Sequence, residues 1–111
     1  MNVLLKIINL NLIIIMTNDL IEIIKNVREK FVDNSDMVWT SYETAKEIRD
    51  ELDSFIQQIN LGDKTCLENL NMHFLPTSTF QEHSLQNGWT KEYLKLSENF
   101  DSIYEKMKNH S

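Results

Sequence analysis

The sequence predicts an all-α fold: a compact antiparallel four-helix bundle with a long ordered linker before the last helix. Apolar residues recur at helical spacing in four segments after residue 16, and no strand pattern of comparable strength accompanies them. Two glycines and one proline in 111 residues leave few tight turns, which disfavours an all-β sandwich or barrel. Leu, Ile, Val and Phe supply 34 residues, enough for one core and therefore one domain.

Residues 1–15 are apolar and differ in composition from the rest of the chain. They read MNVLLKIINLNLIII and are interrupted by Lys6, Asn9 and Asn11. The run is shorter than the roughly 20 apolar residues of a transmembrane helix, so we do not expect a membrane span. It also lacks the positive start and the small-residue cleavage site of a signal peptide.

We interpret Met16 as the natural start of the protein. The three residues after it, Thr17, Asn18 and Asp19, are all helix N-cap types. Residues 1–15 would then be an apolar extension upstream of that start, and residues 16–111 a single helical domain. A weak membrane anchor and an integral strand or helix are the alternatives for the extension.

The first two helices are predicted from their apolar stripes. The first runs from Asp19 to about Val32, with the stripe Leu20, Ile23, Ile24, Val27 and Phe31. The second is expected to begin at Thr40, because Glu43 three residues later completes a capping box. Its stripe covers about five turns, and Gly62 is expected to end it in the left-handed conformation.

The last two helices flank the linker. The third opens with a capping-box pattern from Thr65 to Glu68 and is short, because Pro76 disfavours the helical conformation for the residue before it. The fourth begins at Thr90, where Trp89 and Leu94 have the spacing of a hydrophobic staple.

The linker itself, residues 75–89, contains a third capping-box spacing. Ser78 and Gln81 are three residues apart, which predicts a short helical turn within the linker.

Composition and motifs exclude several function classes. The net charge is −6 and no Lys/Arg cluster is present, so we do not expect nucleic-acid binding. No Glu-x-x-His or G-x-S-x-G motif occurs, so we assign no metal site, no cofactor and no catalytic residue. Cys66 is the only cysteine and cannot form an internal disulfide, which favours the reducing cytoplasm.

Two surfaces are candidates for contact with a protein partner. The second helix carries an acidic side that would steer a basic partner, made of Glu43, Glu47, Asp50 and Glu51. The linker offers Phe80, His83 and Trp89 as contact residues of a recognition loop. In the alternative interpretation the acidic side is an ordinary solvated face. In the linker, Phe80, Leu85 and Trp89 would then anchor a long loop to the bundle, and its Ser, Thr and Gln side chains would bind its own backbone.

Residues 76–104, PTSTFQEHSLQNGWTKEYLKLSENFDSIY, resemble a segment of small uncharacterised bacterial proteins. Those proteins pair a Pro-Thr, Phe-Gln-Glu and Ser stretch with Asn-Gly-Trp, Glu-Tyr-Leu and Phe-Asp. Some small acidic proteins of this general kind act as immunity proteins, which block a co-encoded toxin by binding it. The resemblance implies that residues 76–104 form one structural unit, and it brings no catalytic residue with it.

The function that these observations favour is non-catalytic protein binding, of the kind in which an immunity protein inhibits a basic bacterial toxin or effector. One alternative is a subunit of a helical homo-oligomer with a structural or regulatory role, in which a second copy covers an apolar bundle face. A further alternative is a small hydrolase or metal-binding bundle.

Overall fold

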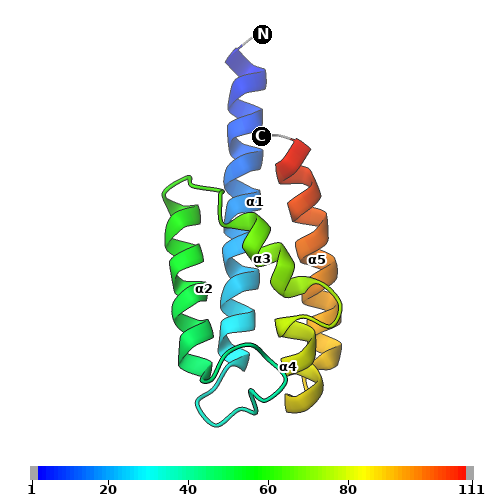
Figure 1. Cartoon of the computed structure of the whole chain (residues 1–111). Coiled ribbons are helices and arrows are strands. Elements are labelled where there is room, and N and C mark those ends of the chain that lie inside the picture. The colour runs from blue at the N-terminus through cyan, green and yellow to red at the C-terminus, as the bar shows by residue number, and fades with distance from the viewer. Residues whose placement is uncertain (1–2, 110–111) are drawn as a thin grey trace.

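The computed structural model describes residues 3–109, and they form five helices (Figure 1). The helices are α1 (Val3–Lys30), α2 (Ala45–Asn60), α3 (Leu67–Phe74), α4 (Thr79–Asn87) and α5 (Thr90–Asn109). No strand occurs within residues 3–109, so the prediction of an all-α fold is confirmed. The structure has five helices over this range instead of the expected four, because the linker itself forms α4.

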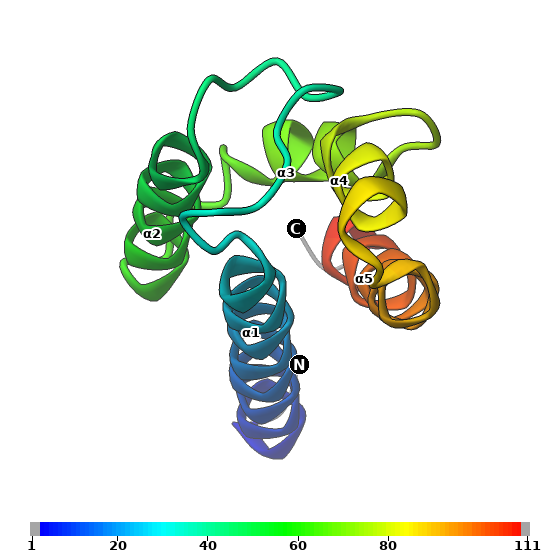
Figure 2. The same ribbon diagram turned by 90° about the horizontal axis from the view of Figure 1, so that it is seen from below.

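Helix α1 is the centre of the arrangement, with α2 packed on one side of it and α5 on the other. The short helices α3 and α4 follow each other across the side that α1 leaves open, and both contact α5 (Figure 2). The enclosed core is aliphatic and aromatic. Within it Phe74 stacks on Phe100 at 4.3 Å between ring centroids and meets Phe80 edge-on at 4.8 Å.

Helix α2 begins four residues later than predicted. Thr44 is its N-cap, and its hydroxyl oxygen accepts the backbone N–H of Glu47 at 3.3 Å. Thr40 instead belongs to the preceding loop, where its hydroxyl donates to the carbonyl of Met37 at 2.8 Å. Both threonines are followed by a glutamate three residues later, so spacing alone does not distinguish the two.

The last helix begins at Thr90 as predicted, but two other predicted end features are wrong. Thr65 does not cap α3, because its hydroxyl donates to Asp63 at 2.7 Å and Cys66 occupies the N-cap position without a side-chain bond. The hydrophobic staple before α5 does not form, since Trp89 is buried in the core while Leu94 is 58 % exposed.

The predicted end of α2 is confirmed. Gly62 has a φ of 81°, and its N–H donates to the carbonyl of Ile59 at 3.0 Å. The next N–H, of Asp63, donates to Gln58 at 2.9 Å, which completes a Schellman motif. A glycine is needed at this position because the left-handed conformation strains other L-residues.

The expected helical turn in the linker is a full helix, α4. Ser78 is its N-cap, although no side-chain bond from Ser78 closes the predicted capping box. The amide oxygen of Gln81 accepts the N–H of Thr77 instead, at 2.5 Å. Thr77 has a φ of 62°, a strained value for a β-branched residue. Gly88, with a φ of 78°, ends the helix.

Helix α1 runs without interruption through the predicted start of the protein. Thr17, Asn18 and Asp19 lie inside the helix, so they do not cap it. Met16 is the first buried residue within the described range, and most of the apolar residues between Val3 and Met16 are exposed. The first turns of α1 project beyond the ends of the other helices (Figure 1). The interpretation of Met16 as the natural start stays a prediction.

Replacing Thr44 by alanine should lower the free energy of unfolding by about 1 kcal/mol, because the N–H of Glu47 then loses its side-chain acceptor. Urea denaturation measures the change. Thr44→Ser keeps the hydroxyl and should retain most of the stability. An alanine variant as stable as the wild type would show that Thr44 is not the cap.

Candidate functional site

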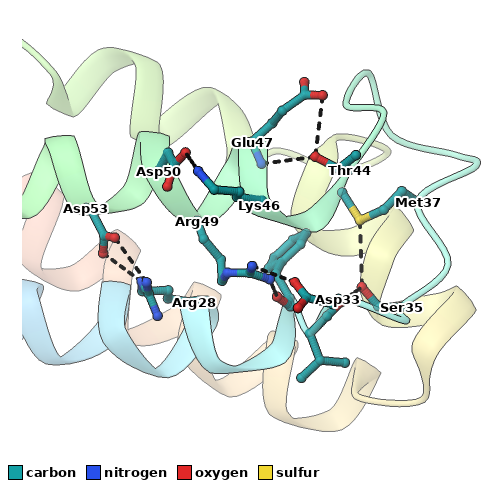
Figure 3. Close-up of polar contacts among 12 residues, drawn as sticks. Arg28, Asp33, Ser35, Met37, Thr44, Lys46, Glu47, Arg49, Asp50 and Asp53 are labelled. Atoms are coloured by element: carbon teal, nitrogen blue, oxygen red, sulfur yellow. Dashed lines mark hydrogen bonds and ion pairs between the residues drawn. The ribbon is translucent and has the colours of Figure 1, made fainter.

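The longest connection between described helices joins α1 to α2, and we call residues 31–44 the α1–α2 loop. Two buried side chains, Phe31 and Met37, fasten it to the core. Arg49 of α2 binds both the carbonyl of Phe31 and the carboxylate of Asp33, each at 2.6 Å (Figure 3). Ser35 caps the first turn of the loop by donating to the carbonyl of Val32 at 2.7 Å. The loop is therefore held from its start.

The middle of the α1–α2 loop is bound by the side chain of Asn87, the last residue of α4. The side-chain oxygen of Asn87 accepts the N–H of Asp36 at 2.8 Å, and its NH2 group donates to the carbonyl of Asp36 at 2.9 Å. One amide thus satisfies both backbone groups of one loop residue. Because a loop must bond its backbone polar groups somewhere, this pair fixes the path of the chain just before Val38.

The loop presents two large apolar side chains to solvent. Val38 is 71 % exposed and Trp39 is 63 % exposed. Tryptophan carries one of the largest apolar surfaces of any residue and is highly buried on average. Trp39 is not among the contact residues predicted from the sequence. The available signal was that it lies outside the apolar stripes of both neighbouring helices.

A hollow of about 490 Å³ lies beside the loop and is lined by Val38, and acidic residues form part of its wall. Asp33, Asp36 and Glu43 contribute carboxylates, and Tyr42 and Met37 contribute apolar surface. This combination suits a cationic group on an aliphatic stem, such as a lysine or arginine side chain.

The four acidic residues predicted to steer a partner have three different environments. Glu43 and Glu47 are exposed, and neither forms an ion pair with a residue in the described range. Asp50 pairs with Lys46 at 2.6 Å, and the hydrogen bond from Lys46 lowers the pKa of its carboxyl (Figure 3). Glu51 is half-buried and belongs to an internal polar cluster.

That polar cluster joins the loop to three helices. The hydroxyl of Tyr42 donates to Glu51, and His73 of α3 lies 3.3 Å from both of these side chains. The other ring nitrogen of His73 lies 2.9 Å from the hydroxyl of Thr79 in α4. Burial, together with the bond to Glu51, raises the pKa of Tyr42.

The cluster contains a carboxylate, an imidazole and a hydroxyl in contact in that order, from Glu51, His73 and Thr79. Catalytic triads have the same order of groups. Thr79, however, is only 7 % exposed. The hollow beside the loop is lined by Tyr42 but by neither His73 nor Thr79. A hydroxyl that substrate does not reach serves the packing of α4 against α3. We therefore interpret the cluster as a structural link between helices.

The three linker residues predicted to contact a partner are in the core. Phe80 and His83 have no exposed surface and Trp89 is 4 % exposed. Their buried position corrects the prediction of a recognition loop at residues 75–89. The segment forms α4, and its aromatic face packs inward against Phe31. The alternative interpretation, in which Phe80, Leu85 and Trp89 anchor the segment to the bundle, is confirmed for Phe80 and Trp89 but wrong for Leu85, which is 55 % exposed.

His83 is enclosed by aromatic rings. It stacks on Phe31 at 3.8 Å between centroids, and its Nδ1 accepts the indole N–H of Trp89 at 2.9 Å. The proton of the neutral ring is therefore on Nε2, which has no partner among the described residues. Burial lowers the pKa of His83 to about 4, against a smaller opposing effect of Asp36.

A scan against models of protein families, a search of curated proteins and a search of solved structures each find nothing that matches this chain. The resemblance of residues 76–104 to small bacterial proteins stays a prediction. No group of three or more His, Cys, Asp or Glu residues within 3–109 is arranged to hold a metal ion.

The folded state should lose stability as the pH falls from about 6.5 toward 4, because His83 takes up its proton more readily in the unfolded chain. The full difference of pKa corresponds to about 3 kcal/mol, present above pH 6.5 and lost near pH 4. Urea denaturation across this range measures it.

The carboxylates titrate over the same range, so the contribution of His83 is the difference between wild type and His83→Asn. His73→Gln is the matched control, which should keep the contribution of His83. Equal pH slopes in wild type and His83→Asn would contradict the assignment.

Proposed function

We propose that this chain is a non-catalytic protein-binding module of the cytoplasm that inhibits a basic bacterial toxin or effector by binding it. The observation that carries the proposal is the exposure of Trp39, 63 %, on a loop that is fixed by side-chain hydrogen bonds. The contact surface comprises the α1–α2 loop and the first turn of α2.

Trp39 and Val38 supply the apolar part of the contact. Tryptophan is enriched among the few interface residues that carry most of the binding energy. The clamp by Asn87 and the bonds from Arg49 hold the loop in place before binding. A surface that is already ordered loses less conformational entropy on association. The loop therefore has the apolar anchor and the preorganisation that a specific interface needs.

Carboxylates around this anchor supply the charge. Asp36, Glu43 and Glu47 surround the start of α2 without ion pairs in the described range, whereas Asp33, Asp50 and Asp53 are each paired with a cation. An excess of unpaired negative charge beside an apolar anchor raises the rate of association with a basic partner. The net charge of −6 acts in the same direction.

The scaffold behind the surface supports the same function. We treat α3 and α4 together as the fourth member of an antiparallel four-helix bundle, broken at Pro76. The break brings Asn87, at the end of α4, to the α1–α2 loop. A bundle with one broken member thus fixes a recognition loop without any cofactor.

Photo-crosslinking in the native cell tests the location of the surface. A benzophenone amino acid at Trp39 should capture one predominant protein. The same probe at Leu94, an exposed apolar residue on α5, should capture none, since Leu94 lies outside the proposed surface. Equal capture at both positions, or capture at Leu94 alone, would contradict the proposal.

Charge removal at the start of α2 should slow association with the captured protein. Glu43→Gln combined with Glu47→Gln should lower the on-rate about tenfold at low salt, with little change at high salt, where charges are screened. Glu98→Gln combined with Asp101→Asn removes two exposed charges from α5 and is the matched control. Stopped-flow mixing measures the rate. An on-rate that does not change with ionic strength would exclude the acidic-face mechanism.

A further inference from the structure

We propose that residues 3–15, the apolar first half of α1, insert into a lipid bilayer and anchor the bundle to a membrane. We call this segment the apolar arm. The proposal concerns the opposite end of the molecule from the α1–α2 loop and does not depend on the function of that loop (Figure 1).

The apolar arm exposes a large aliphatic surface. Nine of its residues are between 37 % and 71 % exposed: Val3, Leu4, Leu5, Ile7, Ile8, Leu10, Leu12, Ile14 and Ile15. Water-soluble proteins scatter such residues singly and seldom gather them into one patch of this size. A patch of this kind marks a site of contact with a partner or a membrane.

The distribution of these residues around the helix indicates whether a protein or a bilayer covers the apolar arm. At 100° per residue the nine side chains cover an arc of about 220°. Lys6, Asn9 and Ile13 lie on the remaining arc, and Ile13 packs against the core. Asn11 is the one polar residue of the arm within the aliphatic arc, and it is exposed. A second copy of the helix would cover one narrow stripe of such an arc. Hydrocarbon chains cover the whole arc at once, so a bilayer fits better than a protein partner.

The outward face of α1 changes from apolar to polar along its length. Leu4 and Glu22 are 18 residues apart, which is five turns, so both point in the same direction from the helix axis. Ile8 and Asn26 are related in the same way. All four side chains are exposed, yet the upper pair is aliphatic and the lower pair is polar. The same face therefore meets two different media, an apolar one above and water below.

The change coincides with the start of the core. Met16 is 4 % exposed and is the first buried residue, and the exposed residues that follow it directly are Asn18 and Asp19. The boundary between the two media thus lies within about one turn of Met16. This is where the bundle would meet the surface of the membrane.

The geometry of α1 also limits how the arm inserts. The helix is continuous from Val3 to Lys30, so a helix lying flat at the depth of the arm would immerse its polar lower face too. The arm is about 20 Å long, shorter than the hydrocarbon thickness of about 30 Å, so it enters the bilayer without crossing it. A tilt with Lys6 and Asn9 uppermost keeps their polar groups nearest the headgroups.

Two other interpretations of an apolar first helix fit less well. Helix α1 is long and apolar enough to cross a membrane by length and composition, a test that core helices and signal sequences also pass. Only 28 % of its most apolar window is buried, unlike a core helix. No small residues precede Met16 to form a signal-peptide cleavage site.

The arrangement at this end of the bundle is consistent with a membrane nearby. The α2–α3 connection, residues 61–66, lies at the same end as the arm (Figure 1). It carries Leu61, which is 79 % exposed. The α1–α2 loop lies at the other end of a molecule that is 53 Å long. An anchored bundle would hold that loop away from the bilayer.

Flotation of the full chain with phosphatidylcholine vesicles, with and without phosphatidylglycerol, tests the proposal. The wild type should float with both kinds of vesicle. Leu4→Glu combined with Ile8→Glu should lower the bound fraction about tenfold or more, since charge in hydrocarbon is unfavourable. Asn18→Glu combined with Asn26→Glu adds two charges to the same helix face below the boundary and should leave flotation from neutral vesicles unchanged. Far-UV circular dichroism checks that each variant remains helical.

Depth is measured with a fluorescent label on a cysteine at Leu4 or, as the control, at Val38. Cys66 is buried and is not labelled in the folded chain. Lipids with brominated chains should quench the label at position 4 and leave the label at position 38 unchanged. The proposal is overturned if the wild type stays in the aqueous fraction, as a monomer or as a dimer through the arm. It is also overturned if Leu4→Glu/Ile8→Glu floats as well as wild type, or if the native protein lacks the arm.

Discussion

The packing of the inward stripe of α1 between α2 and α5 is the interaction on which the rest of the structure depends. Leu20, Ile24 and Val27 are at most 1 % exposed, and α1 contacts both neighbouring helices. The main helix–helix packing of α2 is against α1. The ion pair between Arg28 and Asp53 is partly exposed, and pairs of that kind contribute about 0–1 kcal/mol. Burial of the aliphatic stripe therefore supplies most of the stability of the bundle. Polar contacts fix the helix ends and the path of the α1–α2 loop.

Periodicity predicted the other four helices because their inner faces are lined almost entirely by apolar and aromatic residues. It missed α4 for a physical reason. The inner face of α4 includes His83 and Ser84, both fully buried, which breaks the apolar pattern. Each finds a partner inside the fold: His83 accepts from Trp89, and the hydroxyl of Ser84 donates to the carbonyl of Gln81. A pattern that counts only apolar residues cannot identify a helix face that also buries polar side chains.

The sequence predicted the negative charge of the candidate surface, but not which residues belong to that surface. Counting carboxylates located the acidic side of α2, yet the sequence does not show which of them are neutralised by residues from elsewhere. Asp53 pairs with Arg28, which is 25 residues away in sequence, and Glu51 is drawn inward by His73. Trp39 was not predicted as a contact residue, because the polar linker at residues 75–89 looked more like a recognition loop. The aromatic residues of that linker form part of the core. Ion pairs between residues far apart in sequence, and the burial of single side chains, can be identified only once the fold is known.

Helix α1 connects the two surfaces that the fold leaves for partners. Its inward stripe continues from Met16 to Val27, while its outward face is aliphatic at one end and polar at the other. A single rigid helix thus fixes the distance between the apolar arm and the α1–α2 loop. Because the arm lies outside the core, its aliphatic surface does not stabilise the bundle, and the fold alone gives no reason for its composition. That composition is explained when the medium around residues 3–15 is apolar, and the α1–α2 loop then faces water at the far end of the bundle.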